Sequence, residues 1–270
     1  MNWHGKQVLV TGGGSGIGRE IVRQLHARGA NVVVATLVQA ELDALVHELP
    51  ASPGSLLPLQ VDLTQDGAID GLMGELDRRD IRLNVLINNA GTALFGNHIE
   101  LDSRRMRNML TLNIQAMSEL AGSVAQHMIK QGTSGHIRNV ASIGAFVPVP
   151  RLAAYTASKH YVLAFSHALA EELEPHGIHV GVLCPGITRT PIYDAMGLES
   201  ANQTKGSVSQ LADSFSMSPE SVAACALRAI EHKQRVALPG LNKLVPLVSV
   251  LPAWVTARFM RRVSDGRSAK

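Results

Sequence analysis

Three side chains that could move a proton lie close together in the sequence. Tyr155 and Lys159 are four positions apart, and Ser142 comes thirteen residues before Tyr155. Residues four apart on a helix share one face, so the phenol and the ammonium are predicted to be neighbours. A free tyrosine has a pKa of about 10, and a nearby ammonium lowers it. Tyr155 could then exchange a proton with an alcohol oxygen while hydride moves at the attached carbon, and Ser142 could hydrogen-bond the same oxygen.

A glycine-rich segment near the start of the chain predicts a dinucleotide site. Residues 11–18 read Thr-Gly-Gly-Gly-Ser-Gly-Ile-Gly and stand between a strand pattern and an amphipathic helix pattern. Glycines let the backbone approach a pyrophosphate, and a helix N-terminus offers it free N–H groups. The same segment without a ligand would be a glycine-rich turn, but its place between strand and helix favours the dinucleotide. The predicted contacts of this loop are Gly12, Gly14, Ser15, Gly16, Ile17 and Gly18.

The residue type that usually selects between NAD and NADP is missing. An Asp or Glu about 20 residues after the loop binds the ribose 2′-OH of NAD, whereas an Arg accepts the 2′-phosphate of NADP. Thr36 ends the second predicted strand and is followed by Leu37 and Val38. Thr36 can hydrogen-bond either cofactor. Because the missing carboxylate removes a repulsion, we predict NADP or NAD as the cofactor, with a slight preference for NADP.

Polar residues at later strand ends extend the predicted site. Asp62 could accept a hydrogen bond from an adenine amino group, or it could cap the following helix. Small residues after the fourth strand would let the backbone run close to a flat cofactor. The predicted contacts at these two strand ends are Asp62, Leu63, Asn89, Ala90 and Gly91. Asn113 lies in the middle of a long helix, where Asn is unfavourable, so a polar task and a local kink both stay open.

Apolar runs alternate with helix patterns along the whole chain. The runs are continuous rather than alternating, which indicates strands covered by helices on both faces. The predicted strands are Gln7–Thr11, Asn31–Ala35, Leu56–Val61, Val85–Asn88, His136–Val140, His179–Leu183 and Arg235–Leu238. The predicted helices are Gly16–Arg28, Gln39–Leu49, Ala68–Asp80, Asp102–Gln131, Ala154–Pro175 and Pro219–His232. This order predicts an α/β fold: a single Rossmann-like, doubly wound domain over residues 1–270, with a seven-stranded parallel sheet and helices on both faces.

The composition narrows the function classes. With 46% hydrophobic and 17% charged residues the chain is globular, and a net charge of +3 is too weak to indicate nucleic acid binding. There are two cysteines and no CxxC motif, which favours a reducing compartment, buried thiols and no metal site. No signal peptide pattern precedes the glycine-rich loop, so we expect a cytoplasmic protein.

Two segments lie outside the regular alternation. Residues 190–218 are polar and predict a mobile substrate loop, with a plain surface insertion as the alternative. Residues 241–270 form an apolar extension whose uncharged stretch, residues 244–257, is shorter than the ~20 residues that span a bilayer. Pro246 and Pro252 also interrupt any single helix. We expect this tail to cap a substrate pocket, pack on a partner subunit, or make peripheral membrane contact through the arginines near its end, in that order.

The motifs together resemble the classical short-chain dehydrogenase/reductase family. The resemblance spans Lys6 to Thr190 and includes Asn-Asn-Ala-Gly at 88–91 and Pro-Gly-Ile-Thr at 185–188. It implies a catalytic tetrad of Asn113, Ser142, Tyr155 and Lys159. In that tetrad Tyr155 is the general acid/base, Lys159 also holds the nicotinamide ribose, and Asn113 supports a water in the proton relay.

The same resemblance implies further contacts and an assembly. Four residues after the sixth predicted strand would cover the nicotinamide: Pro185, Gly186, Ile187 and Thr188. Family members are usually homodimers or homotetramers, paired through the long helices that here carry Asn113 and Tyr155. Arg138 departs from the family pattern, because it stands on a central strand where an apolar residue is normal. A buried charge is costly, so we expect Arg138 to reach solvent or to meet a carboxylate.

These observations predict an NAD(P)-dependent oxidoreductase that acts on a small-molecule alcohol or ketone, and the apolar tail indicates a lipophilic one. The alternative is a non-catalytic dinucleotide sensor that regulates a partner, which would not need Ser142, Tyr155 and Lys159 together. A sugar-nucleotide epimerase or dehydratase also uses a Tyr–Lys pair, but it usually carries a larger C-terminal substrate domain.

Overall fold

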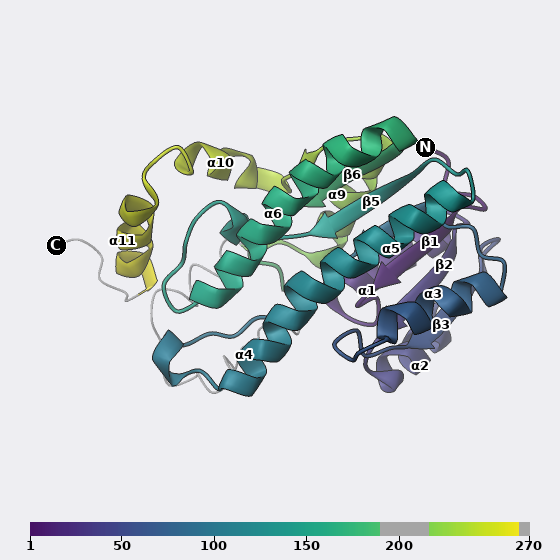
Figure 1. The fold of residues 1–270 in the computed structure, drawn as a ribbon, viewed down its shortest axis with the longest axis horizontal. Helices are drawn as coiled ribbons and strands as arrows, with labels where there is room; N and C mark the ends of the chain where they lie inside the picture. The colour runs from purple at the N-terminus through teal and green to yellow at the C-terminus, as the bar shows by residue number, and fades with distance from the viewer. Residues whose placement is uncertain (190–215, 265–270) are drawn as a thin grey trace.

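The computed structural model describes residues 1–189 and 216–264. Its centre is a seven-stranded sheet in the order β3-β2-β1-β4-β5-β6-β7, and all neighbouring strands are parallel (Figure 1). The strands are β1 (Gln7–Thr11), β2 (Asn31–Thr36), β3 (Leu56–Gln60), β4 (Val85–Asn88), β5 (Gly135–Val140), β6 (Ile178–Leu183) and β7 (Val236–Ala237). The predicted doubly wound parallel sheet is confirmed.

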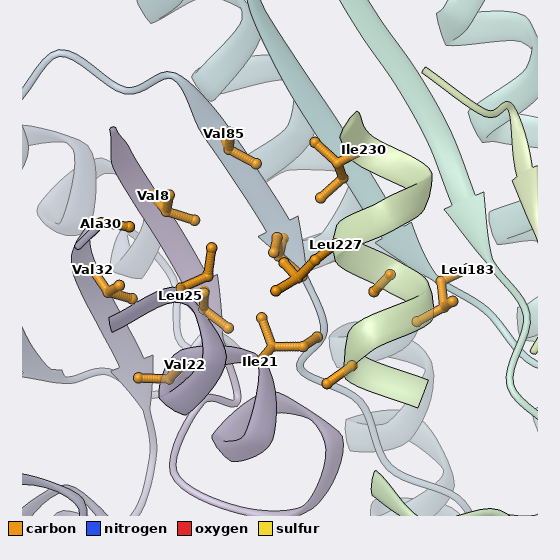
Figure 2. Packing of buried hydrophobic residues seen from close by; sticks show 14 of the residues in the cluster. Val8, Ile21, Val22, Leu25, Ala30, Val32, Val85, Leu183, Leu227 and Ile230 are labelled. Carbon is orange, nitrogen blue, oxygen red and sulfur yellow. The ribbon is translucent and has the colours of Figure 1, made fainter. Parts of the chain in front are cut away.

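Helices cover both faces of the sheet. One layer holds α1 (Gly16–Ala27), α2 (Gln39–Glu48) and α9 (Pro219–Glu231), and the other holds α3 (Ala68–Arg78), α5 (Met117–Lys130) and α6 (Ala153–Leu173). Figure 2 shows the first layer, where Ile21 and Leu25 of α1 lie beside Leu227 of α9. Val8 of β1 packs in this layer while the next residue, Leu9, packs in the other. Successive strand side chains point to opposite faces, so both must be apolar, which explains the continuous runs.

The long helix predicted over Asp102–Gln131 is divided into three parts. It consists of α4 (Ser103–Leu110), a π-helical segment η2 (Thr111–Ala116) and α5. The sequence contains no Pro in this stretch to mark the change. Wider π turns of this kind occur often at functional sites, and η2 carries Asn113.

The apolar tail folds into short pieces at one end of the molecule. They are a 3₁₀ helix η6 (Gly240–Leu244), α10 (Val245–Val248) and α11 (Ala253–Ser264), and Pro252 immediately precedes α11. In Figure 1 α10 and α11 of the tail lie at the left, on the side of the molecule opposite β1, β2 and β3. Within residues 1–189 and 216–264 no helix is long and apolar enough to cross a membrane. Most of the predicted substrate loop, residues 190–215, lies outside the described residues.

Both expectations for Arg138 are wrong. The side chain is only 3% exposed, and its Nε has no hydrogen-bond partner in the described part of the chain. Burial lowers its pKa to about 10, and the groups that oppose this shift are the thiols of Cys225 and Cys184, not a carboxylate. The structure accommodates the guanidinium because Gly181 stands opposite Arg138 on β6, where any Cβ would contact Arg138 Nη1. The expected burial of the thiols is confirmed for Cys184, whereas Cys225 is half-buried.

Candidate active site

The catalytic candidates meet beyond the carboxyl ends of β4 and β5. Ser142 follows β5 by two residues, while Tyr155 and Lys159 lie on successive turns of α6. Lys159 Nζ lies 5.8 Å from the centroid of the Tyr155 ring and donates a hydrogen bond to the Val140 carbonyl at 3.0 Å. The predicted pairing of phenol and ammonium on one helix face is therefore present, and a backbone carbonyl of β5 fixes the lysine head group.

Ser142 connects the strand end to the phenol. It caps the 3₁₀ helix η3 (Ile143–Ala145), where its Oγ accepts a hydrogen bond from Gly144 N at 3.1 Å. Burial raises the pKa of Tyr155, and a side-chain hydrogen bond with Ser142 opposes the shift. The pKa of Tyr155 is therefore raised in this structure and not lowered as expected, because the loss of solvent outweighs the contacts that favour the phenolate. Tyr155 keeps its proton at neutral pH.

The surroundings of Lys159 also shift its pKa. It is 5% exposed, and burial lowers its pKa from 10.5 to about 8, while the nearby Cys184 opposes the shift. A group with that pKa is still mostly protonated at pH 7. Lys159 therefore supplies a positive charge beside the Tyr155 ring, and this charge is lost under mildly alkaline conditions.

The structure gives Asn113 a polar task within a π-helical segment. Its side chain holds the backbone of Thr92, accepting from Thr92 N at 3.0 Å and donating to Thr92 O at 2.9 Å. Its Nδ2 also lies 3.2 Å from Ser158 Oγ on α6. A Cβ built on Gly91 would lie 3.1 Å from Asn113 Oδ1 and 3.4 Å from Lys159 Nζ, so the strand end after β4 lies directly against these two side chains.

The glycine-rich loop has the geometry that a phosphate site needs. Gly12 and Gly16 have φ values of +60° and +53°, which favour glycine. Gly18 packs so closely on the loop that any Cβ would contact the Gly12 carbonyl. The N-cap residue of α1, Ser15, makes no side-chain hydrogen bond to the first turn. The N–H groups of that turn, including those of Gly16 and Ile17, are the donors that would hold a pyrophosphate.

Two of the other predicted contacts have structural partners. Asn89 donates through Nδ2 to the carbonyls of Thr11 and Gly12, at 3.0 and 3.1 Å, so it holds the glycine-rich loop against β4. Asp62 accepts hydrogen bonds from Thr64 and Gln65, which hold its pKa below the ordinary value although burial acts in the opposite direction. The next helix is capped by Gly67, so Asp62 is not its N-cap. Leu63 is buried.

The segment after β6 lies beside the turn that follows β5. The carbonyl of Pro185 accepts from Ile143 N at 2.8 Å, which ties it to the turn that follows Ser142. Gly186 lies so close to Asn242 that a Cβ would be 2.6 Å from Asn242 Nδ2. Ile187 and Thr188 pair with Met217, joining this segment to the residues before α9. The four predicted residues 185–188 therefore form one wall next to Ser142.

One charged residue at the predicted cofactor site is absent from the sequence-based prediction. Glu41, in the first turn of α2, lies with Oε2 3.2 Å from Thr36 Oγ1. A Cβ on Gly14 would lie 2.5 Å from the same oxygen. A carboxylate therefore reaches the end of β2 from the following helix, although its residue stands five positions after Thr36. The sequence signal that could have found it is an acidic residue in the first turn of the helix that follows β2.

Comparison with known proteins identifies the family. The family model for short chain dehydrogenases matches residues 6–200. The chain belongs to the short-chain dehydrogenase/reductase family. A curated relative, the L-xylulose reductase of Homo sapiens, is 34% identical over 191 residues, which cover 71% of this chain and 75% of that protein. The probable oxidoreductase EphD of Mycobacterium tuberculosis is 27% identical over 254 residues, 88% of this chain but only 43% of that protein. The chain therefore spans less than half the length of EphD.

Solved structures of the family share the whole fold. A short-chain dehydrogenase from Sphingobium yanoikuyae, in complex with NADPH, has a TM-score of 0.79 and 30% identity, with 98% of each chain covered. A short-chain dehydrogenase/reductase from Burkholderia phymatum, in complex with NAD, also has a TM-score of 0.79, at 25% identity and 93% coverage of each chain. Similar family members thus bind either dinucleotide.

Proposed function

We propose that this short-chain dehydrogenase/reductase is an NAD(P)-dependent oxidoreductase that interconverts a ketone and an alcohol. The observation that carries this proposal is the meeting of Ser142, Tyr155 and a buried, charged Lys159 at one edge of the sheet. The glycine-rich loop after β1 opens at the same edge, with Gly91 between the two groups of residues. A dinucleotide on that loop would extend toward the catalytic pair, as ligands do at the carboxyl ends of strands in this fold.

Each catalytic residue has a defined task in this reaction. When bound, the reduced nicotinamide supplies the hydride. Tyr155 donates its phenolic proton to the carbonyl oxygen, and its raised pKa keeps that proton in place at neutral pH. Ser142 donates a hydrogen bond to the same oxygen as negative charge develops. Lys159 stabilises the phenolate left behind, and Asn113 fixes the backbone after β4 against the pair.

The surroundings of the site support a lipophilic substrate. A cavity of about 380 Å³ lies between the segment after Ser142, helix α6 and the tail. Its apolar lining includes Ala145, Phe146, Pro148, Leu163 and Leu251. The tail thus contributes a wall of this cavity, which supports the first of the three roles considered for it. Residues 1–270 would then form one catalytic domain whose tail completes the substrate pocket.

The exposed apolar surface of the tail indicates what the protein could associate with. The tail exposes large apolar side chains beyond the cavity, with Leu247 69%, Val250 82% and Trp254 69% exposed. Such a surface supports a homodimer or homotetramer, or peripheral membrane contact beside the arginines of α11. A cytoplasmic location stays a prediction.

The role of Tyr155 is tested by Tyr155→Phe against the matched control Tyr161→Phe on the same helix, where the tyrosine is 40% exposed. The control should keep its turnover of a ketone panel with NADH or NADPH. The Tyr155→Phe variant should keep its melting temperature and dinucleotide affinity but lose at least about 100-fold in kcat, because it has no proton to donate. Turnover close to that of the unmodified protein would refute the assignment. Dinucleotide binding without turnover of any ketone or alcohol by the unmodified protein would favour the regulatory sensor.

A further inference from the structure

Glu41 places a carboxylate at the end of β2. It stands in the first turn of α2, and its Oε2 accepts a hydrogen bond from Thr36 Oγ1 at 3.2 Å. On the other side it lies over the glycine-rich loop, where a Cβ on Gly14 would be 2.5 Å from Oε2 and 2.6 Å from Glu41 Cβ. Any side chain at position 14 would therefore displace Glu41. The glycine at position 14 is therefore needed to leave room for the Glu41 side chain.

This position corresponds to the adenosine end of the dinucleotide site. In doubly wound folds the adenosine ribose lies between the first βα turn and the end of the second strand. Gly14 belongs to that turn and Thr36 is the last residue of β2, so Glu41 bridges the two elements that flank the ribose. A carboxylate there accepts hydrogen bonds from ribose hydroxyls and repels a phosphate.

The two arginines of α1 that could attract a phosphate form ion pairs with another carboxylate. Leu37 and Val38, which follow β2, are apolar and 57% and 45% exposed, so their side chains offer no cationic group to a phosphate. Arg19 and Arg23 of α1 both form ion pairs with Glu48 at the far end of α2. In the described part of the chain, a 2′-phosphate at this point would meet the Glu41 carboxylate first.

We propose that Glu41 is the residue that determines cofactor choice and that it selects NAD. Its carboxylate accepts a hydrogen bond from the ribose 2′-OH and repels the 2′-phosphate of NADP. This inference rests on the proposed dinucleotide-dependent function. It reverses the slight preference for NADP drawn from the sequence, which assumed that no carboxylate reaches the end of β2.

The test is a direct binding measurement on the full chain. The dissociation constants of NADH and NADPH are measured by isothermal titration calorimetry for the unmodified protein, Glu41→Gln and Asp43→Asn. Asp43 is the matched control, because it carries the same charge on α2 but is exposed and bonded to Gln39. A hydrogen bond to a charged group, together with phosphate repulsion, predicts at least about tenfold tighter binding of NADH by the unmodified protein.

Glu41→Gln should reduce the ratio of the NADPH and NADH dissociation constants to about threefold or less, mainly because NADPH binds more tightly. Asp43→Asn should leave this ratio unchanged. Higher salt should also reduce the ratio of the unmodified protein, because it screens the repulsion. Equal or tighter binding of NADPH by the unmodified protein, or an unchanged ratio in Glu41→Gln, would overturn the role of Glu41 alone. If neither dinucleotide binds, the proposed function fails with it.

Discussion

Replacing Lys159 with Met should change the way that stability depends on pH. Lys159 has a pKa of 10.5 when exposed and about 8 in the folded protein, because burial disfavours the ammonium. Between these two values the unfolded chain binds more protons at this position than the folded protein does. The free energy of unfolding therefore rises with pH across this window, and the penalty for burying the charge is fully present below pH 8. The Met variant has no such contribution.

The size of the effect follows from the two pKa values. The gap between them corresponds to about 3.4 kcal/mol in total. About 2.5 kcal/mol of this should appear between pH 7 and pH 10. Both proteins share all other titrating groups, so those contributions cancel when one free energy of unfolding is subtracted from the other.

The assay is urea unfolding followed by circular dichroism at pH 7, 8, 9 and 10. The free energy of unfolding of the unmodified protein, minus that of Lys159→Met, should increase by about 2.5 kcal/mol as the pH rises from 7 to 10. The exposed Lys130 supplies a matched control, since Lys130→Met removes a lysine charge without changing a buried site. A constant difference for Lys159→Met, or one that moves in the opposite direction, would refute the claim that burial lowers the pKa of Lys159.

Two further substitutions test the site and its support. Ser142→Ala should lower kcat for ketone reduction by about 100-fold or more while dinucleotide affinity stays the same, because the variant loses a donor to the developing oxyanion; an equal rate would remove Ser142 from the mechanism. Gly181→Ala should destabilise the protein by about 1–3 kcal/mol in urea unfolding, because the new Cβ contacts the buried Arg138 guanidinium. Gly122→Ala in α5 is its control, since a Cβ there meets nothing within 4 Å, and an equal effect of the two would contradict this packing.

The sequence by itself determined the fold and the pairing of Tyr155 with Lys159. Uninterrupted apolar runs predict strands buried on both faces, and the glycine pattern between the first strand and helix predicts a phosphate cradle. Tyr155 and Lys159 were predictable because helical spacing fixes their relation locally, whatever the rest of the chain does. All seven strands were predicted at nearly their observed positions because each continuous apolar run marks its own strand locally.

Only the tertiary structure decided the properties that depend on neighbours distant in the sequence. The pKa of Tyr155 rises because several elements bury the phenol, and no local pattern records that loss of solvent. Arg138 is tolerated because Gly181, on another strand, leaves room for it. Glu41 reaches the end of β2 because α2 packs its first turn over Gly14. Charge and solvation depend on what surrounds a group in space, and that arrangement exists only once the sheet and its helices have assembled.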